Sequence, residues 1–222
     1  PQTGEEANCI CFNYFRDGKL VNVKYRDGAK NFKQSKGGEK IFYKLDDVSQ
    51  EDVKEVIISE GEADALSFEE AGYKNAISVP DGAPNPKSKD FASKFSYLDN
   101  CADVLGKMER VLLAVDTDAP GELLKNEIAR RVGKHKCWIV KYPEGCKDAN
   151  DVLVKHGADT LKKCVEEAEM YPIEDILMVK DFSNEIDYLY GKGFDSGVTV
   201  GFDTCHSDKL KPFDRLISFK TS

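Results

Sequence analysis

Short apolar runs alternate with amphipathic stretches through the middle of the chain. The runs at 53–59, 76–79, 111–115 and 137–140 predict buried strands. Helical spacing predicts a helix that stops at Gly72 and others over 97–108, 120–132 and 160–169. Strands that alternate with helices in this order predict an α/β domain with a parallel sheet flanked by helices.

The first part of the chain has a different pattern. Residues 9–24 alternate between apolar and polar positions on either side of Asp17-Gly18, which is a hairpin signal. Basic strands are predicted at 24–28 and 31–34, and another strand at 41–45. We therefore expect a small, mostly β, basic subdomain at 1–48, the parallel α/β domain at 49–172, and a helical linker with a truncated tail at 173–222.

Charge is distributed unevenly along the 222 residues. The net charge is -8, but residues 16–44 hold nine Lys or Arg against three Asp or Glu, which is +6, so the remainder carries -14. An acidic body beside a basic strand region suits an enzyme that acts on phosphates. The alternative is a solvated charged hairpin whose aromatic residues are core. The residues expected to meet phosphate, nucleotide or template are Lys24, Arg26, Lys30 and Lys33.

Composition excludes several classes of protein. Mean hydropathy is -0.49, and no apolar run approaches the length of a membrane span, so no membrane partner is expected. No transit peptide is visible in the first nine residues. The seven cysteines are odd in number and scattered, which favours a reducing compartment. Cys9 and Cys11 form a lone C-x-C, so we expect no zinc in this chain.

Acidic residues follow two of the predicted strands. Glu60 comes directly after one strand, and Asp116 and Asp118 follow another. The carboxyl ends of parallel strands meet at one edge of a sheet, so these side chains can converge there. Carboxylates this close repel unless a cation separates them, and Mg²⁺ binds such oxygens at roughly 2.0–2.1 Å. Alternatively, Asp118 only caps the next helix and Asp116 is a solvated loop acid.

A further acid and a loop are expected at the same edge. Asp148 follows the strand at 137–140 by a short loop, next to a candidate helix cap at Asn150 or Asp151. A pure capping role for this acidic group is the alternative. The proline-rich stretch 80–86 is predicted to be a loop there as well.

The strand-ending Glu60-Gly61 and the later strand-ending Asp116-x-Asp118-x-x-Gly121 together resemble the Toprim domain, which DnaG-type primases, topoisomerases and some nucleases share. A longer set of motifs, in the same order along the chain, is similar to the RNA-polymerase region of the phage-type primase-helicases and their organellar relatives, the Twinkle family. The sequence most resembles that of the plant organellar members. The matching stretches include Lys24-Tyr25-Arg26-Asp27, Glu60-Gly61-Glu62-Ala63-Asp64, Val79-Pro80-Asp81-Gly82-Ala83-Pro84, Asp116 to Gly121, and Lys147-Asp148-Ala149-Asn150.

This resemblance implies a DNA primase-like nucleotidyltransferase that makes short RNA primers from ribonucleoside triphosphates on single-stranded DNA. Its metal-binding residues would be Glu60, Asp64, Asp116, Asp118 and Asp148, with Mg²⁺ or Mn²⁺ in a two-metal site. Glu60, Asp116 and Asp118 would be catalytic, and Glu60 would either ligate an ion or act as a general acid/base. Lys147 would join the basic residues that bind nucleotide or DNA. A replicative helicase or DNA polymerase is an implied partner, and the mitochondrion or chloroplast the implied location.

The sequence also departs from the family pattern. It lacks the zinc module, and no G-x-x-x-x-G-K-[ST] follows the helicase-like stretch 197–203, so we expect no ATP-driven unwinding by this chain. The chain is then either a natural stand-alone protein or a fragment. Two other functions remain open: a weakly catalytic accessory that binds single-stranded DNA, and a Toprim phosphodiesterase or nuclease. A topoisomerase is disfavoured because no further domain carries its tyrosine.

Overall fold

The computed structural model describes residues 8–85 and 92–173, which form two sheets with flanking helices. The larger sheet has the order β5-β4-β6-β7-β8, and its first four strands are parallel while the edge strand β8 is antiparallel. The strands, in chain order, are β4 (Glu55–Ser59), β5 (Ala76–Ser78), β6 (Arg110–Ala114), β7 (Cys137–Ile139) and β8 (Glu169–Met170). The predicted α/β class with a mostly parallel sheet is confirmed.

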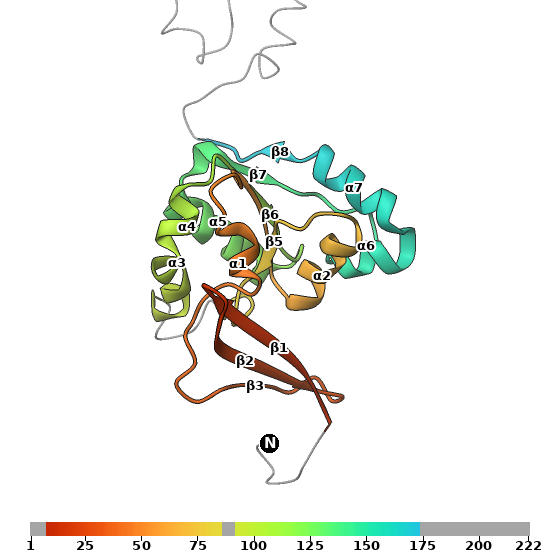
Figure 1. The fold of residues 1–222 in the computed structure, drawn as a ribbon. Coiled ribbons are helices and arrows are strands. Elements are labelled where there is room, and N and C mark those ends of the chain that lie inside the picture. Colours follow the sequence, from red (N-terminus) through yellow and green to blue (C-terminus); the bar gives the residue numbers. More distant parts are fainter. Residues whose placement is uncertain (1–7, 86–91, 174–222) are drawn as a thin grey trace, which may run out of the picture. The chain divides into compact units, whose positions relative to one another are not determined.

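Helices cover both faces of this sheet (Figure 1). One face carries α1 (Leu45–Val48), α3 (Ser96–Asn100), α4 (Ala102–Gly106) and α5 (Ala119–Val132). The other carries α2 (Glu62–Glu70), α6 (Ala149–His156) and α7 (Ala158–Glu166). Short 3₁₀ turns lie at η1 (Ala92–Phe95) and η2 (Lys134–Lys136).

Strand alternation divides the core into two layers. In β4, Val56 and Ile58 belong to the cluster under α5, whereas Ile57 belongs to the cluster under α2. All three side chains are fully buried. A central strand of a sheet covered on both faces has no solvent side, which is why the middle of β4 has three consecutive apolar residues, Val56 to Ile58.

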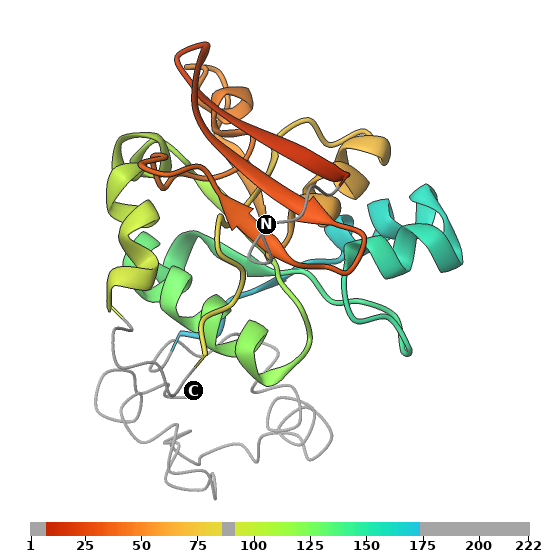
Figure 2. The same cartoon turned by 90° about the horizontal axis from the view of Figure 1, so that it is seen from below.

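The basic N-terminal residues form a separate antiparallel sheet of β1 (Cys9–Arg16), β2 (Lys19–Asp27) and β3 (Phe32–Gln34), which Figure 2 shows in front. The predicted hairpin turns at Asp17 and Gly18, whose φ angles of 52° and 72° suit a two-residue turn. Phe12 and Tyr14 of β1 are buried in the same cluster as α1 and α5. This contact attaches the small sheet to the α/β domain.

Several predicted elements differ from the structure. The separate strand predicted at 24–28 is the end of β2, which runs without a break from Lys19 to Asp27. Residues 41–45 are not a strand: Tyr43 makes only an isolated bridge to Ser78, and Lys44 turns left-handed (φ 62°) so that α1 begins at Leu45. The helix predicted over 97–108 is two short helices, because Cys101 leaves helical geometry (φ -117°, ψ 18°). The helix predicted to reach residue 169 ends at Glu166, and Glu169 pairs with Ile139 in β8.

No helix within the described ranges is long and apolar enough to cross a bilayer. The predicted linker helix and helicase-like tail, from residue 174 onward, lie outside the described residues, as does the end of the loop at 80–86. The division into domains at residues 48 and 172 stays a prediction.

Candidate active site

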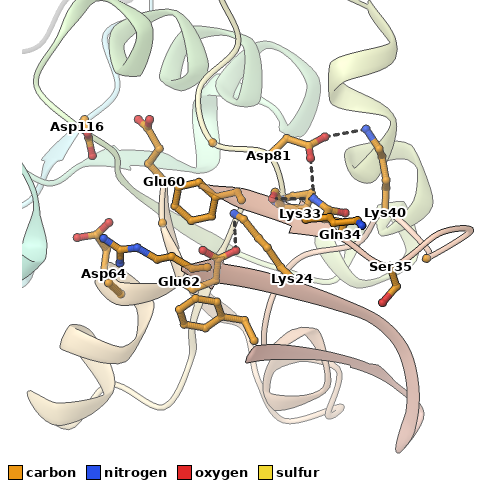
Figure 3. A pocket seen from close by; sticks show the side chains of 18 of the residues that line it. Lys24, Lys33, Gln34, Ser35, Lys40, Glu60, Glu62, Asp64, Asp81 and Asp116 are labelled. Atoms are coloured by element: carbon orange, nitrogen blue, oxygen red, sulfur yellow. Dashed lines mark hydrogen bonds and ion pairs between the residues drawn. The ribbon is translucent and has the colours of Figure 1, made fainter. Parts of the chain in front are cut away.

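A pocket with a volume of about 890 Å³ lies between the carboxyl edge of the parallel sheet and the small antiparallel sheet. Figure 3 shows Glu60 and Asp116 on one side of it and Lys33 with Gln34 on the other. The acidic wall is therefore supplied by the α/β domain, and the basic wall by β2 and β3 with the residues that follow.

Three carboxylates converge where β4 and β6 end. Ser59 and Ala114, the last residues of these strands, are paired in register, so Glu60 and Asp116 emerge from neighbouring positions. One carboxylate oxygen from each of Glu60, Asp116 and Asp118 lies within 4.8 Å of the other two. This is the convergence that the strand pattern predicted.

Glu60 is half-buried and only partly satisfied. Its Oε1 accepts a hydrogen bond from the backbone N–H of Ala83 at 3.2 Å. Its Oε2 is buried and, within the described part of the chain, has no hydrogen-bond partner. Burial, and then repulsion by Asp116, raise the pKa of Glu60 to about 7. Glu60 is therefore only partly ionised at neutral pH unless a cation stabilises its charged form.

Lys147 bridges the other two carboxylates. Its Nζ lies 2.6 Å from Oδ2 of Asp116 and 3.2 Å from Oδ2 of Asp118. Burial raises the pKa of Asp116, against the opposing effect of Lys147. The pKa of Asp118 is lowered, mainly by the hydrogen bond that it accepts from the backbone N–H of Gly121 at 2.9 Å. Asp118 is thus the N-cap of α5 and a member of the carboxylate cluster at once.

Asp64 and Asp148 line the same pocket but lie outside the three-carboxylate cluster. Asp64 is buried on α2 and accepts a hydrogen bond from the backbone N–H of Asn150 at 3.1 Å. Burial, and then Asp148, raise the pKa of Asp64 to about 7. The cap of α6 is Asp148, which accepts from the N–H of Asp151 at 2.7 Å; the predicted cap at Asn150 or Asp151 is wrong.

The predicted basic residues divide into three groups. Arg26 and Lys33 line the pocket with side chains that reach solvent. Lys24 also lines it, but this lysine is 7% exposed and its Nζ lies 2.7 Å from Oε1 of Glu62, so its charge is largely neutralised. Lys30 is not among the pocket residues; it lies exposed in the turn before β3.

Glu62 was not singled out by the sequence. It is 3% exposed in the first turn of α2, and its Oε1 also accepts a hydrogen bond from the hydroxyl of Tyr14 at 2.5 Å. Tyr14 and Lys24 belong to the small sheet, so Glu62 connects that sheet to the α/β domain through two polar contacts. Its sequence position resembles that of any exposed acid at a helix start, and only the tertiary contact reveals its role.

The donor set fits a hard divalent ion. Carboxylate oxygens are the preferred ligands of Mg²⁺, and Asp116, Asp118 and Glu60 supply them from two strand ends. The buried Oε2 of Glu60 adds an acceptor that has no hydrogen-bond partner among residues 8–85 and 92–173, and the ammonium of Lys147 is already held by two of the carboxylates. The cluster thus binds positive charge by its own geometry.

Gly121 makes the cluster possible, since a Cβ at this position would lie 2.2 Å from the carbonyl oxygen of Asp116. We expect Gly121→Ala to lower the free energy of unfolding by roughly 1–3 kcal/mol because the backbone beside Asp116 must move. The matched control is Gly106→Ala, in α4, where nothing lies within 4 Å of the added methyl group. Urea unfolding compares the two variants. Equal stability would show that residue 121 has room for a side chain.

The raised pKa of Glu60 predicts a pH dependence of stability in protein kept metal-free with a chelator. Between the ordinary value of 4.5 and about 7, the folded state keeps a proton that the unfolded chain has released, so rising pH destabilises the wild type. The Gln variant has no such proton. We therefore expect the stability of Glu60→Gln relative to wild type to increase from pH 4.5 to pH 7.5.

Thermal unfolding across this pH range measures the effect. Glu167→Gln, at an exposed position after α7, is the matched control. A difference between Glu60→Gln and wild type that stays constant with pH would contradict the burial of Glu60.

Comparison with known proteins agrees with this geometry. The Toprim domain family matches residues 54–141, a range that spans β4 to β7 and contains all three clustered carboxylates.

Two curated proteins of Arabidopsis thaliana are similar to this chain. The "Twinkle homolog protein, chloroplastic/mitochondrial" is 45% identical over 206 residues, covering 87% of this chain and 29% of the relative. The "Primase homolog protein" is 46% identical over 176 residues, covering 74% of this chain and 52% of the relative. The chain therefore spans about a third and about half of the lengths of these two relatives.

Solved primase structures share the fold. A chain of the bacteriophage T7 complex, in which the lagging-strand DNA polymerase interacts with primase domains bound to an RNA/DNA hybrid and dTTP, aligns with a TM-score of 0.60 at 20% identity, covering 74% of this chain and 80% of that chain. The RNA polymerase domain of Mycobacterium tuberculosis primase DnaG aligns with a TM-score of 0.57 at 13% identity, covering 74% of this chain and 56% of that chain. Residues 54–141 thus match the Toprim domain family, and most of the chain is similar in sequence to the plant Twinkle and primase homologues.

Proposed function

We propose that the pocket is the nucleotidyl-transfer site of a DNA primase-type RNA polymerase, which joins ribonucleotides into short primers on single-stranded DNA. The observation that carries this proposal is the meeting of Glu60, Asp116 and Asp118 within 4.8 Å, in a pocket whose opposite wall contains Arg26 and Lys33. Acidic metal ligands opposite basic phosphate-binding residues are what polymerisation of nucleoside triphosphates requires.

The acidic residues would have different roles in metal binding and proton transfer. Asp116 and Asp118 would hold one divalent ion, and Asp64 and Asp148, on the same pocket wall, would complete a second site. Mg²⁺ or Mn²⁺ bound there supplies activation of a 3′-hydroxyl and neutralisation of the triphosphate. Glu60, with a pKa of about 7, is suited to hold and release a proton near neutral pH, or to serve as a further ligand.

The basic residues would bind the charged substrates. Arg26 lies on the wall opposite the carboxylates, so it is the proposed contact for triphosphate or template phosphates. Lys33 also borders the pocket, but it pairs with Tyr25, so its side chain belongs to the other face of β3 and is proposed only as a template contact. Lys147 is held between Asp116 and Asp118, a position next to any phosphate bound at the cluster. Lys24 contributes mainly through its pair with Glu62, and Lys30, in the exposed turn outside the pocket, is a further proposed template contact. Each phosphate contact makes binding more sensitive to salt.

The relatives suggest the biological setting. One carries the name "chloroplastic/mitochondrial", so we propose a role in organellar DNA replication for this chain. A T7 relative in fold is described in a complex with a DNA polymerase, so a replicative polymerase or helicase is the proposed partner class. The RNA primer would provide the 3′-hydroxyl that such a polymerase extends.

The proposal is tested by incubating the whole chain with single-stranded DNA, four ribonucleotides and Mg²⁺ or Mn²⁺. We expect short labelled RNA oligomers that depend on both the DNA and the metal ion. DNA binding without oligomers would favour a replication accessory. DNA shortened in the absence of ribonucleotides would favour a phosphodiesterase, and either result would overturn the polymerase proposal.

A further inference from the structure

Phe32 is a large apolar side chain exposed in a charged pocket. It opens β3 and is 49% exposed, while the other residues around this pocket include the carboxylates Glu60 and Asp116. A phenylalanine ring that only served the core would be buried, as Phe12 of the same pocket is. The exposed ring is therefore available to a ligand that has both an apolar flat surface and phosphate groups.

Sheet register places the ring on the face that lines the pocket. Arg26 pairs directly with Phe32, and Lys24 pairs with Gln34, two residues further along β3. Side chains at directly paired and alternate positions share one face of an antiparallel sheet, so all four belong to the same face. All four also line the pocket, which identifies this face as its wall.

Two cations hold the ring in place. The Nζ of Lys24 lies 5.0 Å from the ring centroid, and the Cζ of Arg26 lies 5.6 Å from it. Lys24 is itself fixed by Glu62, with side chains 9% and 4% exposed respectively. A buried ion pair thus supports the ring of Phe32. Because the ring is already held in position, it loses little conformational entropy when a ligand binds.

We propose that Phe32 stacks on the nucleobase of the nucleoside triphosphate whose phosphates bind at the carboxylate cluster, an inference that rests on the proposed nucleotidyl-transfer function. Lysines and metal ions suffice for phosphate, and neither role needs an aromatic ring on the pocket wall. Every base has a π-face, so stacking binds all four nucleotides, and Arg26 can extend the stack as a planar cation. Base pairing with the template, rather than Phe32, would then select the nucleotide.

The test compares ATP with inorganic tripolyphosphate, which carries the phosphates without a base, by calorimetric titration in the presence of Mg²⁺. We expect Phe32→Leu to weaken ATP binding roughly tenfold while tripolyphosphate affinity stays at the wild-type value. Phe32→Tyr keeps the ring and should bind ATP as wild type does. Leu20→Ala, which removes an exposed apolar side chain of β2 away from the pocket, is the matched control and should leave both affinities unchanged.

Three outcomes would overturn the inference. In the first, Phe32→Leu binds ATP as tightly as wild type. In the second, it loses affinity for ATP and for tripolyphosphate equally. In the third, it weakens binding of single-stranded DNA and spares ATP, which would place a template base on the ring. Primer synthesis by the wild type is scored in parallel, because failure of the proposed function abolishes primers in every variant, whereas failure of the stacking inference leaves wild-type primers intact.

Discussion

Asp116→Asn is expected to lower the rate of primer synthesis at least about 100-fold, which corresponds to about 2.7 kcal/mol of transition-state stabilisation. Asp116 lies at the carboxyl end of β6, with its oxygen within 4.8 Å of those of Glu60 and Asp118. The amide keeps the size of the side chain and removes the charge that would hold a divalent ion. Labelled ribonucleotide incorporation on single-stranded DNA gives the rate.

Binding of single-stranded DNA, followed by fluorescence anisotropy, should change little in this variant, because the proposed template contacts belong to the small antiparallel sheet and its connecting turn, not to the strand end that carries Asp116. The matched control is Asp159→Asn, since Asp159 in α7 has a fully exposed side chain. Its primer synthesis should equal that of wild type. Undiminished synthesis by Asp116→Asn would show that this carboxylate does not take part in the reaction.

Lys24→Met is expected to destabilise the folded protein by about 3–5 kcal/mol, the cost of leaving one partner of a buried ion pair uncompensated. The side chain of Glu62 is 4% exposed, and without Lys24 the side-chain donor left to its carboxylate among the described residues is the neutral hydroxyl of Tyr14. Because both donors come from the small sheet, this loss should also loosen the contact between that sheet and α2. The midpoint and slope of urea unfolding measure the change.

Lys163→Met is the control for this substitution, because the side chain of Lys163 is 69% exposed and its distance to Glu167 is 3.6 Å. Surface pairs of this kind contribute little, so its stability should stay within about 0.5 kcal/mol of wild type. The double variant Lys24→Met/Glu62→Gln should regain part of the loss, since no buried charge is left. If Lys24→Met unfolds at the same urea concentration as Lys163→Met, the ion pair does not hold the two parts together.

The parallel sheet could be predicted from the sequence because burial on both faces leaves a continuous apolar run, as in residues 56–58. The acids that follow such runs could be placed for the same reason: a strand end fixes where the next side chain emerges. Glu60 and Asp116 were located in this way without any knowledge of side-chain contacts.

The sequence alone could not show whether an acidic residue caps a helix, joins the carboxylate cluster, or does both. For Asp118 a helix cap and a site carboxylate were treated as alternatives, and the structure has both, because one oxygen accepts from the N–H of Gly121 while the other faces Lys147. An N-cap side chain lies at the start of a helix that follows a strand, which is also the edge where the site forms. The two roles therefore share one position rather than competing for it.

Contacts between segments that are distant in the chain could not be predicted from the sequence pattern. The basic run at 16–44 predicted phosphate-binding lysines, yet Lys24 is paired with Glu62, 38 residues later in the chain. Similarly, residues 41–45 have strand-like composition, but Lys44 turns left-handed, and α1 begins at Leu45, whose side chain is buried in the hydrophobic core. Neither outcome follows from local propensity, because packing between the two sheets determines both.

The central claim is that carboxylates from two strand ends together hold one divalent ion, and binding of Mn²⁺ tests it most directly. Mn²⁺ is titrated into the whole chain, and electron paramagnetic resonance measures the concentration of free ion. Glu60, Asp116 and Asp118 would then act as one site. We expect saturable binding by wild type and by Asp159→Asn, and at least about tenfold weaker binding by Asp116→Asn, since a lost ligand charge costs more than about 1.4 kcal/mol. Equal Mn²⁺ affinity for wild type and Asp116→Asn would contradict a shared metal site at the ends of β4 and β6.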